Sequence, residues 1–198
     1  MELKPCVIFT PNRLIDLIWV VWLASWIAAS FWSGRTQRQI GGLETWTYRA
    51  AMIGGGVLLF PGTERSLGET PLWDVGIRGG YIVVWLMFAG LAFSWWARIH
   101  LGRLWSSMIT RKEGHRIVDT GPYGLVRHPI YTGLIAALSA TAAVDATITA
   151  LIGAALVIFG LFLKASSEER FLMLELGGES YQAYCRGVPM LIPFILRH

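Results

Sequence analysis

The chain has 198 residues, of which 54% are hydrophobic, with 10 tryptophans and a formal net charge of +4. This composition is too apolar for an ordinary soluble domain and predicts a small all-α, polytopic membrane protein with one domain over residues 1–198. No basic run is interleaved with aromatic residues, so we expect no nucleic-acid partner. Cys6 and Cys185 lie far apart in the sequence, so we expect neither a disulfide nor a metal site.

Three apolar segments in the N-terminal part, residues 1–97, predict membrane helices at about 14–32, 46–60 and 79–96. No cleavable-signal pattern precedes the first, so we expect it to be retained. Its tryptophans, Trp19, Trp22 and Trp26, recur at helical spacing and predict one packing face. The second contains Ala50, Ala51 and three glycines at 54–56, which let another helix approach closely and favour an interior position.

The C-terminal part, residues 98–198, begins with a long polar connection that reaches Arg127. Two apolar helices follow at 129–144 and 147–164, and their short separation predicts an antiparallel hairpin. Pro129 is favourable at a helix start, where its missing N–H would be unpaired in any residue. After Lys164 the pattern becomes amphipathic as far as Gly177 and Gly178. The sequence therefore predicts about five spans, a hairpin and a polar tail.

The distribution of positive charge predicts the orientation of these spans. When the 98–127 connection is placed in the cytoplasm, 13 of the 17 Lys and Arg residues lie on that side. This orientation predicts that the N-terminus lies outside. We expect the protein to reside in a bacterial-type inner membrane, with its site facing the cytoplasm. The polar connection and the acidic tail share the cytoplasmic face, as a joint site requires.

One polar stretch, KEGHRIVDTGPYGLVRHPIY at 112–131, stands between the apolar segments. Its polar groups need partners, which a bound ligand could provide. Taken alone, Arg127 could be an interfacial anchor and His128 a helix cap. The short hairpin, however, brings this stretch next to Glu168 and Glu169, one helix pair later. We therefore expect a shared site at the cytoplasmic end of the hairpin.

Three motifs resemble the isoprenylcysteine carboxyl methyltransferase family and its phospholipid methyltransferase relatives. They are LGRLWS from Leu101, GHRIVDTGPYGLVRHPIYTG from Gly114 and EERFLMLELGGESYQAYCRGVP from Glu168. Together they cover roughly the C-terminal half of the chain, and they are specific in combination and order. The first two helices resemble the family only in being apolar.

The resemblance implies S-adenosylmethionine as the cofactor. Apolar and aromatic side chains would line its adenine ring, while its polar ends need donors and acceptors. A carboxylate such as Glu169 could accept from ribose hydroxyls or from the ammonium group. The residues implied as cofactor contacts are His115, Ile117, Val118, Tyr123, Arg127, His128, Pro129, Tyr131 and Glu169.

The reaction implied by the resemblance is direct methyl transfer to a lipophilic small molecule, for which alignment and exclusion of water are the main requirements. A carboxylate acceptor, as in an isoprenylcysteine-like substrate, needs no base, whereas an amine would need one, for which Glu168 is the candidate. Glu168 could equally be a solvated carboxylate. Family members place a substrate-binding arginine where this chain has Ala165. Lys164 is adjacent and could position the substrate, although it lacks the planar fork of arginine.

Two further functions remain open on the sequence: an NADPH-dependent lipid or sterol reductase, and a non-catalytic protein that binds membrane lipids. Other polar residues are expected to be structural. Tyr181 and Tyr184 should pack the tail against the bundle, and His100 and His198 lack ligand-like partners. The remaining basic residues of the connection are expected to face lipid headgroups, namely Arg98, Arg103, Arg111 and Arg116.

Overall fold

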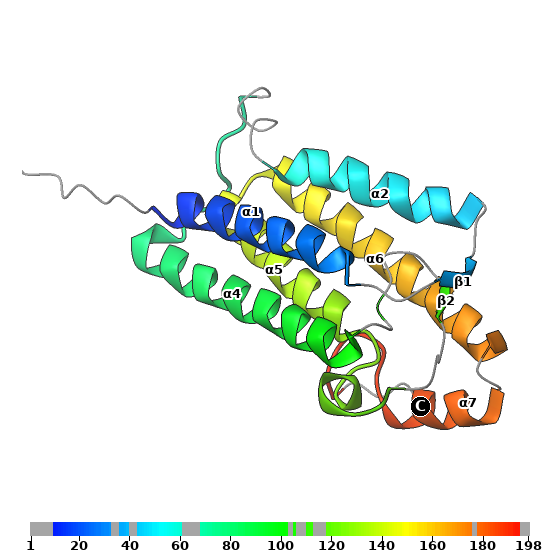
Figure 1. The fold of residues 1–198 in the computed structure, drawn as a ribbon. Helices are drawn as coiled ribbons and strands as arrows, with labels where there is room; N and C mark the ends of the chain where they lie inside the picture. Colours follow the sequence, from blue (N-terminus) through cyan, green and yellow to red (C-terminus); the bar gives the residue numbers. More distant parts are fainter. Residues whose placement is uncertain are drawn as a thin grey trace, which may run out of the picture.

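The computed structural model describes residues 10–32, 36–39, 43–60, 68–102, 105, 110–112, 118–175 and 178–194. Five long helices in these ranges form a bundle with roughly aligned axes (Figure 1). They are α1 (Pro11–Ser30), α2 (Leu43–Leu59), α4 (Gly76–Leu101), α5 (Pro129–Asp145) and α6 (Ile148–Glu175). The short helices η2 (Gly121–Gly124) and α7 (Gly178–Gly187) lie at one end. The predicted all-helical bundle and its C-terminal hairpin are confirmed.

The structure also contains a small antiparallel strand pair that the sequence pattern did not predict. Strand β1 (Thr36–Gln39) follows α1, and β2 (Thr110–Lys112) follows α4. The pair therefore joins the two polar connections at this end of the bundle. Strands of three or four residues without an alternating apolar pattern give no detectable period in the sequence.

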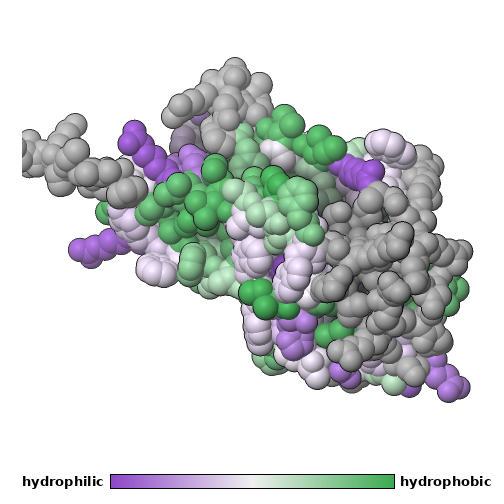
Figure 2. All heavy atoms as spheres, viewed as in Figure 1, coloured by the Kyte–Doolittle hydropathy of each residue, from purple (hydrophilic) through white to green (hydrophobic). Residues whose placement is uncertain are grey.

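Within the described residues, three helices are long and apolar enough to cross a membrane: Pro11–Ser30, Gly76–Leu101 and Ile148–Leu174. Helix α5 is apolar but has 17 residues, or roughly 25 Å at the helical rise per residue. Helix α2 is equally short and includes Glu44 and Arg49. Hydrophobic side chains cover much of the visible face over α1 and α2 (Figure 2), as expected for contact with lipid.

The tryptophan face predicted for α1 packs into the bundle. Trp19 and Trp22 are buried, and the Trp19 indole N–H donates to the Thr141 hydroxyl of α5 over 3.0 Å. Trp22 stacks on Trp26, with ring centroids 4.6 Å apart. Trp26 in turn meets Trp95 of α4 edge to face. These contacts fix α1 against α4 and α5, so the packing interpretation is confirmed.

The interior position expected for α2 is wrong. This helix packs chiefly on α6 and lies at the edge of the bundle (Figure 1), where Trp46 and Ile53 are exposed. Of its three consecutive glycines only Gly55 approaches α6: a Cβ there would lie 2.6 Å from the Gly153 carbonyl oxygen. Gly54 and Gly56 have nothing within 4 Å of such a Cβ. Small residues on one turn point in different directions, so their number did not indicate burial on every side.

Close packing of α4 on α5 positions the first turns of α5. A Cβ at Gly90 would lie 2.7 Å from the Gly133 carbonyl oxygen, and a Cβ at Gly133 would overlap Gly90 and Ser94. The Ser94 hydroxyl donates to the Ile130 carbonyl over 2.9 Å. At the far end of α5, Ala146 adopts a left-handed conformation with φ 54° and turns the chain into α6. The start of α5 is therefore held against α4, and its end leads directly into α6.

We predict that Gly133→Ala destabilises the protein by about 1–3 kcal/mol, because the added methyl group overpacks the α4–α5 contact. The matched control is Gly54→Ala, where the methyl group meets no neighbour. Thermal unfolding of both variants in detergent, followed by tryptophan fluorescence, measures the difference. A melting temperature for Gly133→Ala equal to that of Gly54→Ala would contradict the packing.

Candidate functional site

The start of α5 is held by the C-terminal segment that follows α7. Pro129 occupies the first helical turn, and His128 stands at the N-cap position without a side-chain capping bond. The backbone N–H groups of Arg127 and His128 donate instead to the carbonyls of Pro189 and Met190, over 2.9 and 3.1 Å. The cap interpretation of the His128 side chain is therefore wrong. Its imidazole is directed to the neighbouring helix.

Arg127 joins α5, α6 and the tail through its guanidinium group. Its Nε and one terminal nitrogen donate to the two carboxylate oxygens of Glu169, at 2.6 and 3.1 Å. Its other terminal nitrogen donates to the carbonyls of Cys185 and Val188. This two-bond geometry needs the planar fork of arginine. It also explains why the chain needs a basic residue just before Pro129, in addition to any role at the membrane surface.

His128 lies between the two glutamates predicted to meet it. Its Nε2 is 3.3 Å from a carboxylate oxygen of Glu169, and its Nδ1 is 3.5 Å from one of Glu168. Burial alone disfavours the imidazolium, but hydrogen bonds and charge interactions with both glutamates outweigh it and raise the pKa of His128 above its usual 6.5. The ring also stacks on Tyr131, with 5.5 Å between centroids. The predicted proximity of the two motifs is thus present in the structure.

Tyr131 connects this charged group to Lys164. Its hydroxyl donates to Glu168 over 2.7 Å. The Lys164 ammonium lies 3.9 Å from the same Glu168 oxygen and 5.3 Å from the centre of the Tyr131 ring. Lys164 and Glu168 are one helical turn apart on α6, so both project from the same face. Ala165, where the family resemblance implied an arginine, is fully buried.

An apolar cluster adjoins the charged residues. Its buried members are Ala97, Trp105, Tyr123 and Ile130, and the partly buried Val118 and Tyr131 pack against them. Tyr131 therefore belongs to both groups: its ring contacts the apolar cluster and its hydroxyl contacts Glu168. We call the side chains of Trp105, Val118, Tyr123, Ile130 and Tyr131 the aromatic wall.

The structure brings together nine of the eleven residues predicted for the site. They are Val118, Tyr123, Arg127, His128, Pro129, Tyr131, Lys164, Glu168 and Glu169. His115 and Ile117 lie outside the described residues. In the described part of the chain, no three His, Cys, Asp or Glu side chains are grouped in a way that could hold a metal ion.

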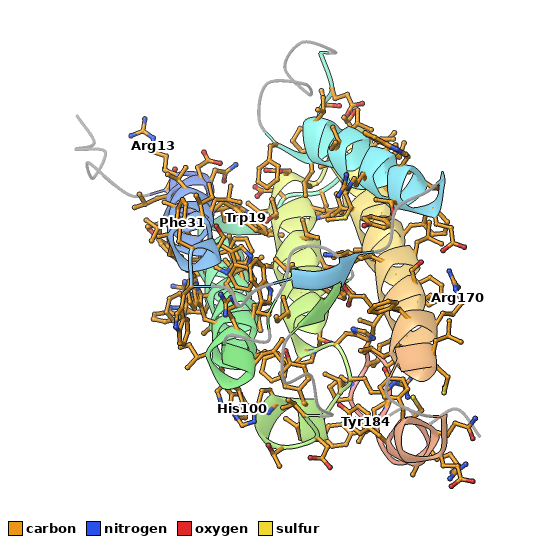
Figure 3. All side chains as sticks on the ribbon, turned by 45° about the vertical axis from the view of Figure 1, so that its right-hand side comes forward. Arg13, Trp19, Phe31, His100, Arg170 and Tyr184 are labelled. Carbon is orange, nitrogen blue, oxygen red and sulfur yellow. The ribbon has the colours of Figure 1, made fainter. Side chains whose placement is uncertain are left out.

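The sequence did not predict the contacts that His100 makes beside Tyr123. His100, at the end of α4, lies 2.9 Å from the Thr120 hydroxyl and stacks on Tyr123. The Tyr184 hydroxyl of α7 donates to the Tyr123 carbonyl over 2.7 Å, which confirms the packing role expected for the tail tyrosines. Figure 3 shows His100 and Tyr184 at the same end of the bundle. A lone histidine without a neighbouring motif gave no signal in the sequence.

The lipid-headgroup role expected for Arg98 is wrong, because this side chain is fully buried. Helix α4 continues to Leu101, beyond the Trp96 end predicted from hydropathy, so Arg98 belongs to the helix and not to the connection. The guanidinium lies 4.3 Å from the centre of the Trp105 ring. Hydropathy placed the helix end at the first charged residue, and it could not anticipate that this charge is buried.

The family model for isoprenylcysteine carboxyl methyltransferase (ICMT) matches residues 82–174. This range includes most of α4, η2, α5, most of α6 and the described residues of the site. The predicted resemblance to the ICMT family is confirmed over these residues. The match covers the first two motifs and the beginning of the third.

Curated relatives are similar to part of the chain. The chain is 27% identical over 135 residues to protein-S-isoprenylcysteine O-methyltransferase B of Arabidopsis thaliana, covering 58% of this chain and 68% of the relative. It is 31% identical over 85 residues to the Xenopus laevis protein-S-isoprenylcysteine O-methyltransferase, covering 43% and 30%. A probable enzyme of the same name from Oryza sativa subsp. indica is 27% identical over 107 residues, covering 54% and 51%. The chain thus spans between about a third and two thirds of these ICMT relatives.

The raised pKa of His128 predicts a pH-dependent stability. The contribution of protonated His128 is fully present below about pH 6.5, the usual value, and it is lost as the pH rises through the higher folded-state value. We expect the melting temperature of the wild type to exceed that of His128→Gln most at mildly acidic pH and least at alkaline pH. Subtracting the two melting temperatures at each pH cancels the contributions of groups that titrate in both proteins. Parallel pH profiles would show that the two glutamates do not stabilise the imidazolium.

Proposed function

We propose that this protein is an integral membrane methyltransferase that uses S-adenosylmethionine and methylates a lipophilic small molecule. The observation that supports this most directly is the position of Tyr131, where the aromatic wall meets the carboxylates of Glu168 and Glu169. A nucleoside with a cationic side chain needs such a combination of an apolar face and anionic acceptors. The match to the ICMT family model gives independent support for methyl transfer.

The described residues fit this cofactor by their chemistry. The aromatic wall is suited to the adenine ring, and Glu169 and His128 lie beside it with groups that accept and donate hydrogen bonds. The cofactor supplies an electrophilic methyl group on a positively charged sulfur. Its contacts would come from Val118, Tyr123, His128, Pro129, Tyr131 and Glu169. His115 and Ile117 are proposed for the same role on the sequence alone.

Arg127 has a different role in this proposal. Both oxygens of Glu169 already accept from its guanidinium, and its remaining donors contact the tail carbonyls. We therefore assign Arg127 as a positioning residue that orients Glu169 toward the cofactor and holds the tail over the start of α5. A carboxylate fixed in this way loses little conformational entropy when a ligand binds.

The structure favours an acceptor that is already anionic, such as the carboxylate of an isoprenylcysteine-like molecule. Glu168 contacts Tyr131, His128 and Lys164, so using it as a base would disturb three existing partners. An anionic acceptor needs no base. Lys164 lies beside Glu168 in the same cluster, where its ammonium group could position the acceptor without the family arginine.

The apolar helix surfaces suggest how the two substrates arrive. Exposed apolar side chains on α1 and α2, including Val20, Ile27 and Val57, place the bundle in a bilayer from which a lipophilic acceptor can enter laterally. The charged cluster lies at the end of the bundle with α7 and the polar connections. We propose that this end faces the cytoplasm, where S-adenosylmethionine is available, with the N-terminus outside and a bacterial-type inner membrane as the location.

Calorimetric titration of the purified protein in detergent tests the cofactor. We expect saturable binding of S-adenosylmethionine and none of NADPH. Incubation with methyl-labelled S-adenosylmethionine and a lipid extract then tests transfer, with label expected in a base-labile methyl ester. Binding of NADPH alone would support a reductase and overturn the proposal. Binding of neither nucleotide would favour a non-catalytic lipid-binding protein.

Glu169→Gln is expected to weaken S-adenosylmethionine binding by about 10- to 100-fold, the scale of one hydrogen bond to a charged group. The amide keeps the size of the side chain but removes its charge. Glu44→Gln is the matched control, because Glu44 also pairs with an arginine, Arg170, but at the exposed start of α2. Isothermal calorimetry measures both dissociation constants. Equal affinity in the two variants would remove Glu169 from the cofactor site.

A further inference from the structure

We propose that Arg98 is a positioning residue of the cofactor site and acts through Trp105. The inference rests on the proposed binding of S-adenosylmethionine at the aromatic wall. It goes beyond that proposal because, within the described structure, the guanidinium of Arg98 contacts backbone carbonyls and indole rings and neither His128 nor Glu169.

Arg98 is fully buried near the end of α4, and its guanidinium joins two helix ends. One terminal nitrogen donates to the Ala29 carbonyl of α1 over 2.7 Å. The other donates to the Gly102 carbonyl, just after α4, over 2.8 Å. Carbonyls at helix C-termini carry partial negative charge, so they are favourable partners for a cation. Among the described residues, no carboxylate forms an ion pair with Arg98.

Aromatic rings contact the remaining surface of this cation. The guanidinium carbon lies 4.3 Å from the Trp105 ring centre and 5.5 Å from that of Trp32. Its Nε is buried and donates no hydrogen bond in the described structure. A guanidinium can lie flat against an indole while its edge donates hydrogen bonds, which an ammonium cannot do. The contact therefore specifies the orientation of the Trp105 ring.

Trp105 packs against the other residues of the aromatic wall, so the orientation of its ring affects their positions. It is buried in one cluster with Tyr123 and Ile130, and its ring meets Trp26 edge to face at 5.7 Å. Val118 and Tyr131 pack against the same cluster. The ring is thus held between Arg98 and Trp26 while it supports the side chains proposed to contact adenine. A charge buried in a membrane helix is expensive, which favours a specific function over an incidental position.

The test compares Arg98→Lys, Arg98→Met and Trp105→Phe with the wild type. Dissociation constants are measured by calorimetry for S-adenosylmethionine and for 5′-methylthioadenosine, which lacks the amino-acid part. Each variant is expected to bind both ligands about tenfold more weakly, the scale of one aromatic contact. The two losses should be equal, because the wall contacts the shared adenosine. Lysine should not restore binding, since it keeps the charge but lacks the planar fork.

Three results would overturn the proposal. Unchanged affinity in folded Arg98 variants would show that the wall does not depend on Arg98. A loss confined to S-adenosylmethionine would mean that Arg98 acts on the amino-acid part of the ligand and not through Trp105. If the Arg98 variants fail to fold, Trp105→Phe provides the test. Wild-type affinity in that variant would show that Trp105 does not influence cofactor binding.

The measurements are made well below each melting temperature, so a small loss of stability alone leaves the dissociation constants unchanged. Arg170→Lys is the matched control, because it makes the same substitution at an exposed arginine that pairs with Glu44. It should bind both ligands as the wild type does. Absence of S-adenosylmethionine binding in the wild type would reject the proposed function itself, which separates that failure from failure of the Arg98 inference.

Discussion

The contact between the Glu168–Glu169 pair and the start of α5 is the interaction on which this end of the protein depends. Two carboxylates on α6 meet Arg127 and His128 from the preceding helix start and Lys164 from their own helix. Desolvating such charges costs several kcal/mol each unless their partners lie close by. The helical hairpin provides those partners. It fixes both helix ends within hydrogen-bond distance.

The same contact extends to the C-terminal tail. Arg127 donates to carbonyls of the tail with the nitrogen that does not face Glu169, and the backbone at 127 and 128 donates to Pro189 and Met190. The backbone N–H groups of the two residues that precede α5 are therefore satisfied by another segment of backbone, and no side-chain cap is present at this helix start. The site, the hairpin and the tail thus form one hydrogen-bonded unit. A functional site is most precise when rigid elements support it in this way.

The sequence predicted the features that follow from short-range geometry. A two-residue separation between apolar helices implied the hairpin, and the hairpin implied that the RHPIY residues meet Glu168 and Glu169, as they do. Helix starts and ends were predicted within a few residues, with two exceptions: α4 continues through Arg98 to Leu101, and the helix expected to be apolar as far as Lys164 is continuous with the amphipathic segment as far as Glu175. A hydropathy pattern ends a membrane helix at the first charged residue, because it assumes that the charge lies in water or among the lipid headgroups. It contains no information on carbonyls and rings from distant segments that can surround a cation.

The other differences have a similar cause. The position of α2 at the edge of the bundle depends on which of its glycines faces α6, and composition does not specify that direction. The contact of His100 with Thr120 and Tyr123 depends on the fold of the connection after α4, where no periodic pattern exists. Residues in such connections are placed by tertiary contacts. The motif residues in the same region were found because several of them recur together in a known order.

The buried Arg98 and the partly buried Arg127 at this end of the bundle show how one type of charge can be stabilised in two ways. Arg127 is paired with a carboxylate, whereas Arg98 is surrounded by helix-end carbonyls and indole rings. Because Arg98 takes no glutamate from the site, both carboxylates stay with Arg127, His128 and Lys164 within the described structure. In the proposed cofactor site, the carboxylate pair organises the polar side and the Arg98–Trp105 contact organises the apolar side.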